Sequence, residues 1–65
     1  MSHFKRMETE KFELENKARL LLEFIENNPI FKNLSDIDAD LLTEQYFHMK
    51  MYLRCLDWRL ARAEK

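Results

Sequence analysis

The chain has 65 residues, enough for one small domain. Its 11 Lys and Arg residues nearly balance its 12 Asp and Glu residues, so the net charge of −1 gives no general attraction to nucleic acid or to an anionic membrane. With 46% hydrophobic residues the chain is too apolar to be disordered. The absence of glycine and the presence of a single proline favour an all-α fold.

A first helix is expected from about residue 3 to residue 26. Apolar residues recur there at the three- and four-residue spacing that places them on one face of a helix. Lys11 is the one polar interruption of this stripe, whose apolar members are Phe4, Met7, Leu14, Ala18, Leu21 and Ile25.

A connector is expected over residues 27–35. Proline disfavours a helical conformation in the residue before it, so Asn28-Pro29 is the strongest break in the chain. Asn28 is also a suitable N-cap for one helical turn that begins at Pro29. Farther on, Ser35 and Asp38 have the spacing of a capping box, which predicts that the second helix begins at about residue 36.

The second helix should run to about residue 63 and carries the clearest pattern in the chain. Its apolar residues follow an unbroken alternation of three- and four-residue steps, which is typical of the seam between packed helices. We call this set the inner seam; it consists of Ala39, Leu42, Tyr46, Met49, Leu53, Leu56, Leu60 and Ala63. Two long helices and a short connector predict an antiparallel hairpin.

A hairpin by itself cannot cover all the apolar residues of the chain, because several lie off the two seams. Large apolar patches left in water usually mark an interface. We therefore expect a homo-oligomeric helical bundle, most simply a dimer with four helices. The predicted oligomer interface consists of Phe12, Phe24, Phe47, Met51, Cys55 and Trp58.

Basic and aromatic residues alternate on the second helix and form the best candidate for a ligand site. Guanidinium and ammonium groups bind phosphate, and aromatic rings stack on bases. The candidate ligand-binding residues are Lys50, Tyr52, Arg54, Trp58 and Arg62. In the alternative interpretation Trp58 and Phe47 belong to the interface, and the arginine heads pair with Glu44, Asp57 or Glu64.

Catalytic and metal chemistry find little support in the sequence. Glu44 and His48 are four residues apart, but no CxxC, HxxxH or HExxH spacing accompanies them, so no metal site is expected. His48 and Cys55 lie about 10 Å apart along a helix, too far for proton transfer within one chain. We expect a protein that is not an enzyme and needs no cofactor.

The compartment follows from equally simple features. A single cysteine fits a reducing environment. No apolar run approaches the roughly 20 residues of a membrane span, and the charged start of the chain does not resemble a signal peptide. The sequence therefore predicts a cytoplasmic protein.

The order of these elements resembles small helical-hairpin accessory proteins of tailed phages, including a family named after a crAss-like phage protein. The resemblance covers nearly the whole chain. It lies in the segment LEFIENNPIF at residues 22–31, in Leu34-Ser35 and Leu41-Leu42, and in Met49, Tyr52, Leu56, Arg59 and Leu60.

This resemblance implies a phage protein that acts in the bacterial host cytoplasm, where proteins of this size often counter host defence. Some similar hairpins assemble into oligomers that capture nucleotide immune signals between subunits. Two alternatives stay open: an inhibitor or adaptor that docks on a host protein, and a dimeric four-helix RNA-binding protein. The near-neutral charge makes the RNA-binding alternative the weaker of the two.

Overall fold

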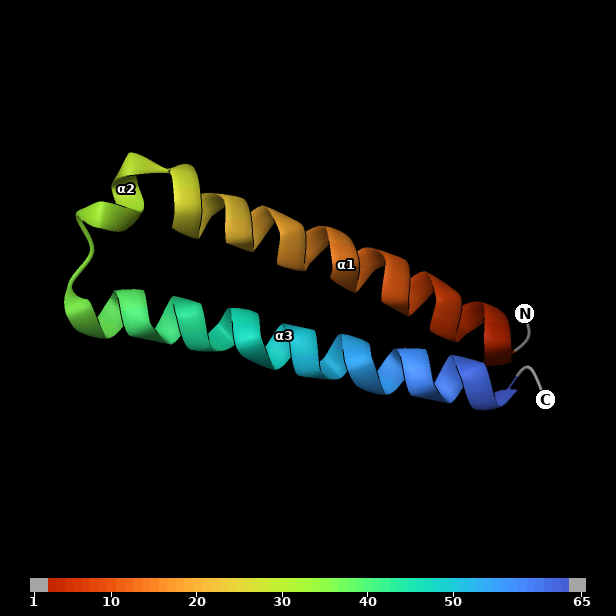
Figure 1. Ribbon diagram of the computed structural model, residues 1–65. Coiled ribbons are helices and arrows are strands. Elements are labelled where there is room, and N and C mark those ends of the chain that lie inside the picture. Colours follow the sequence, from red (N-terminus) through yellow and green to blue (C-terminus); the bar gives the residue numbers. More distant parts are fainter. Residues whose placement is uncertain (1–2, 64–65) are drawn as a thin grey trace.

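The computed structural model describes residues 3–63 as a hairpin of two long antiparallel helices (Figure 1). Helix α1 spans His3–Asn27, the short α2 spans Pro29–Lys32, and α3 spans Asp36–Ala63. The two ends of the described chain meet at one end of the hairpin, and α2 lies at the other. The predicted hairpin is thus confirmed, and its assembly into a bundle stays a prediction.

The connector is held by side-chain and backbone hydrogen bonds. Asn28 caps α2, because its Oδ1 accepts a hydrogen bond of 2.9 Å from the backbone N–H of Ile30. Ser35 caps α3 in the same way, with its Oγ accepting a 3.2 Å bond from the N–H of Asp38. With these caps the chain reverses its direction between α1 and α3 without a glycine residue.

The core lies along the line where α1 meets α3. Every member of the inner seam except Ala63 is buried or half-buried, and so is every member of the α1 stripe, including Lys11. Leu56 has no exposed surface at all. Most of the buried residues lie in the half of the hairpin that carries the termini; the buried residues are Met7, Ala18, Leu53, Leu56 and Leu60.

Aromatic packing closes the other end of the hairpin. Phe24 near the end of α1 meets Phe31 of α2 edge to face, with ring centroids 6.2 Å apart. The contact fastens the connector to α1 and takes up part of the ring that was expected at an oligomer interface. Phe24 is accordingly half-buried within its own chain.

No helix within residues 3–63 is both long enough and apolar enough to span a membrane.

Candidate ligand-binding site

The basic and aromatic residues predicted as a site all lie on α3, and the helix spreads them around its circumference. Lys50, Arg54, Trp58 and Arg62 are four residues apart, so each is rotated by about 40° from the one before. Tyr52 is two residues from Lys50 and therefore projects from nearly the opposite flank of α3. Within one chain, Tyr52 cannot share a ligand with Lys50.

Arg54 and Trp58 are the pair that the structure brings together. They line a shallow hollow with Asp57 and Ala61. Trp58 is 63% exposed, so a face of its indole is open to a ligand. The hollow thus offers a guanidinium group beside an aromatic ring, the combination that binds a phosphate and a base.

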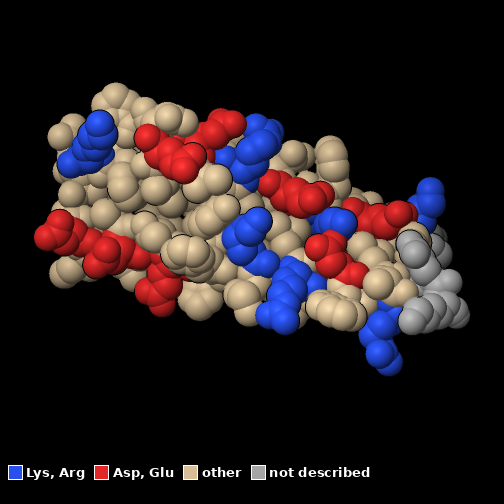
Figure 2. Space-filling view, viewed as in Figure 1, with Lys and Arg blue, Asp and Glu red and all other residues tan. Residues whose placement is uncertain are grey.

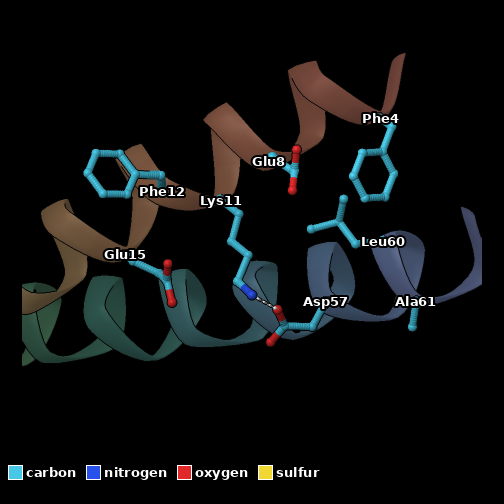
Figure 3. A pocket seen from close by; sticks show the side chains of 8 residues that line it. All are labelled: Phe4, Glu8, Lys11, Phe12, Glu15, Asp57, Leu60 and Ala61. Atoms are coloured by element: carbon cyan, nitrogen blue, oxygen red, sulfur yellow. Dashed lines mark ion pairs between the residues drawn. The ribbon is translucent and has the colours of Figure 1, made fainter. Parts of the chain in front are cut away.

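Asp57 is the acidic member of this hollow, and it is already paired with a residue of the other long helix. The Nζ of Lys11 lies 2.7 Å from Oδ1 of Asp57 (Figure 3). The hydrogen bond that Lys11 donates, followed by the attraction of the Asp57 charge, raises the pKa of Lys11 above its ordinary value of 10.5. Lys11 pairs with this carboxylate, and Arg54 makes no ion pair with any described residue and is available for an anion.

The other predicted cations lie in separate places. Lys50 lines a hollow between the long helices together with Arg19 and Tyr46. Arg62 lines another at the end of the hairpin, with His3 and Arg59. Neither Lys50 nor Arg62 forms an ion pair within residues 3–63. One chain therefore presents three separate basic positions rather than one assembled pocket.

The residues predicted at an oligomer interface are mostly open to water in the single chain. Phe12 is 65% exposed, Phe47 61% and Met51 54%, and the free thiol of Cys55 is exposed as well. Phe24 is the exception described above. Burial of Cys55 would need a second molecule, because its own hairpin leaves it in water.

In the alternative interpretation, the arginine guanidinium groups pair with Glu44, Asp57 or Glu64, and these three carboxylates differ in what the structure shows. Asp57 pairs with Lys11, and Glu44 lies 3.5 Å from His48 on the exposed side of α3. Glu64 lies outside the described residues. Neither of the two described carboxylates is taken by an arginine. Within residues 3–63, no three His, Cys, Asp or Glu side chains are placed to hold a metal ion together.

A second hollow, which sequence reasoning missed, lies around the Lys11–Asp57 pair. Figure 3 shows Lys11 reaching down from α1 to Asp57 on α3, with the rings of Phe4 and Phe12 on either side. Glu8 and Glu15 add further negative charge to its wall. Lys11, the polar interruption of the α1 stripe, is the sequence feature that indicates this hollow. A lysine among the apolar residues between two helices needs a partner on the facing helix.

Comparison with known proteins places the chain in a family. No curated protein and no solved structure matches it. The sequence model of one family, Sequestin, matches residues 1–62 and thus nearly the whole chain. The chain belongs to the Sequestin family.

Proposed function

We propose that this Sequestin protein is a non-enzymatic phage protein that counters host defence by sequestering a nucleotide immune signal in the bacterial cytoplasm. The family's name indicates sequestering, which fits a protein that acts by binding. The resemblance to phage hairpins supports the origin and the setting. The observation that carries the proposal is the guanidinium of Arg54, which has no ion pair within residues 3–63, beside the exposed ring of Trp58.

The chemistry of that pair suits a nucleotide. A guanidinium group forms charge-assisted, often bidentate hydrogen bonds with a phosphate. An indole gives a stacking face that accepts any base, and each stacked base contributes about 1–3 kcal/mol. Binding of this kind makes and breaks no covalent bond. It is sufficient for a protein that removes a signal from solution.

A homo-oligomer belongs to the same proposal. Nucleotide sites are normally concave and bury most of the ligand, whereas the Arg54–Trp58 hollow is shallow and lies on one helix. A second copy could supply the missing wall. It would also cover exposed apolar residues such as Phe47 and Met51, which a stable soluble chain rarely leaves in contiguous patches.

Titration calorimetry with cyclic oligonucleotides and ADP-ribose-type signals tests the proposal. For the signal that binds, Arg54→Ala should weaken binding by about 1.5–3 kcal/mol, roughly tenfold or more, because a charge-assisted contact is lost. Lys17→Ala is the matched control, since Lys17 is an exposed cation on α1 away from the hollow. The proposal fails if the purified wild-type protein binds none of these signals.

A second function is favoured by exposed apolar residues on α1. Phe12 and Leu20 are more than half exposed and lie on α1, whereas the candidate ligand-binding residues lie on α3. An inhibitor or adaptor that docks on a host protein could use them. Such a protein should capture one stoichiometric host partner from lysate and lose it in Phe12→Ala, with nucleotide binding unchanged. Capture that is equal in Phe12→Ala and wild type would contradict this alternative.

A further inference from the structure

A second seam runs along α3 on the side away from α1. Its members again alternate between four- and three-residue steps, and each of them is exposed. We call it the outer seam; it consists of Ile37, Leu41, Glu44, His48, Met51, Cys55, Trp58 and Arg62. Ile37 is 72% exposed, the largest value among the large apolar side chains of the described residues. Such a seam is the type of surface on which a further helix packs.

Charge is divided unequally along the same helix. Between residues 36 and 48 there are no Lys or Arg residues, and there are four carboxylates, on Asp36, Asp38, Asp40 and Glu44. Between residues 49 and 63 there are four cations, on Lys50, Arg54, Arg59 and Arg62. Asp57 is the one acid in that second half, and Lys11 already pairs with it. Figure 2 shows the red groups gathered on α3 at the connector end and blue groups farther along.

We propose that a second copy of the chain docks on the outer seam with its α3 antiparallel to the first. The inference rests on the homo-oligomer proposed above and gives it a surface and a direction. In an antiparallel pair, the acidic half of each α3 lies beside the basic half of the other, so the net electrostatic interaction between the two helices is attractive. A parallel pair would align acid with acid and base with base, which costs free energy.

The spacing of the outer seam fits this arrangement. The steps 4-3-4-3-4-3-4 read the same in both directions, so an antiparallel copy matches the seam with itself about a two-fold axis between His48 and Met51. Leu41 then lies opposite the partner's Trp58, and both side chains are more than half exposed in the single chain. Glu44 lies opposite the partner's Cys55.

The same register affects the ligand site. Lys50 lies within about one residue of the axis along α3, and Arg54 about 6 Å farther on. Both project to the same flank of α3, with Lys50 nearer to α1 and Arg54 nearer to the outer seam, and Phe47 lies on that flank too. Two copies would thus bring two lysines, two arginines and two phenylalanine rings to one flank of the paired helices. A ligand with two phosphates would then find cations from both subunits, which one chain alone does not supply.

Disulfide trapping under mild oxidation tests the direction of docking. In Glu44→Cys, the introduced thiol lies opposite the partner's Cys55, and covalent dimers should form at least about tenfold faster than in wild type. Wild-type Cys55 lies about 16 Å along the helix from its symmetry mate in this register, too far for a disulfide. Glu44→Cys combined with Cys55→Ser is the matched control and should not cross-link.

Other outcomes would overturn the proposal. Rapid cross-linking of wild type through Cys55 would show a parallel pair, and equally slow cross-linking of all three proteins would show that another face is used. A measurement of the mass in solution distinguishes a wrong docking direction from a failure of the proposed function, which includes the homo-oligomer. A dimer without the expected cross-link removes the direction alone, whereas a monomer at every concentration removes the homo-oligomer too.

Salt dependence gives a second measurement that needs no variant. Attraction between opposite charges is screened by salt, so the dissociation constant of an antiparallel dimer should rise as salt is added. A parallel dimer, which salt relieves of repulsion, should become tighter. A dissociation constant that falls with salt would therefore contradict the proposal even if Glu44→Cys failed to fold.

Discussion

The two seams of α3 share one helix and one spacing, yet they have opposite environments. The inner seam of α3 contains no charged residue and is buried against α1, with Leu56 fully enclosed. The outer seam contains Glu44, His48 and Arg62 among its apolar members and lies in water. The difference shows how one helix can hold a fold together with one face and keep the other for binding. Uninterrupted apolar residues decide the fold, while charged residues among apolar ones keep the outer face compatible with water.

The largest expected effect comes from truncating one large apolar side chain on each seam and comparing the losses in the free energy of unfolding. Leu56→Ala should cost about 2–5 kcal/mol in the free energy of unfolding, because it removes buried methyl groups and leaves a cavity. That is a large part of the stability of a domain this small. Circular dichroism at 222 nm during urea unfolding measures it.

Met51→Ala on the outer seam is the matched control. Since more than half of Met51 is exposed, its truncation should leave unfolding of the dilute single chain nearly unchanged. Equal losses in Leu56→Ala and Met51→Ala would mean that both seams are buried under these conditions. The distinction drawn between them for the single chain would then be wrong.

A charge placed on the outer seam should separate the copies without unfolding them. Met51→Glu puts a carboxylate close to the proposed axis in each subunit, where the contact between the two copies would bury it. The dissociation constant should rise by at least about tenfold, equivalent to about 1.4 kcal/mol. Light scattering during gel filtration measures the mass, and circular dichroism shows whether the helices persist.

Phe12→Glu is the control on α1. Phe12 is as exposed as the outer-seam residues but lies on the other helix, so its replacement should leave the mass unchanged. If Phe12→Glu dissociates the protein and Met51→Glu does not, the copies meet through α1 and the outer seam has another use.

The hairpin could be predicted from the sequence because its signals are local. The spacing of the inner seam fixes which face of α3 is buried, and Asn28-Pro29 and Ser35 mark where helices begin. The structure ends α1 at Asn27, one residue beyond the expected end, and begins α3 at the expected Asp36.

Contacts between the helices could not be predicted in the same way, because they depend on register. The spacing of two seams leaves open which turn of α1 faces which turn of α3, so the partner of Lys11 could not be identified until both helices were placed. Tyr52 and Lys50 are close in sequence, but a rotation of about 200° on the helix points their side chains in nearly opposite directions. The contact between Phe24 and Phe31 likewise depends on how α2 folds back.

The smallest expected effect concerns the one charged residue within the packed stripe of α1. Lys11 has a raised pKa because it donates a hydrogen bond to Asp57. A group whose pKa is raised by folding stabilises the fold fully below its ordinary pKa and loses that contribution as the pH rises through the higher folded value. Starting from neutral pH, the contribution of this pair should thus be constant up to about pH 10.5 and decline above it.

Melting temperatures of wild type and Asp57→Asn, measured across this range, isolate the effect, because the variant keeps the side-chain volume and removes the charge. The difference between the two melting temperatures therefore reports on the pair of Lys11 and Asp57. That difference should be small, since the pair is open to solvent on one side, and should shrink only above about pH 10.5. If it stays constant to higher pH, the ion pair does not contribute to stability, and the inner seam depends on its apolar residues alone.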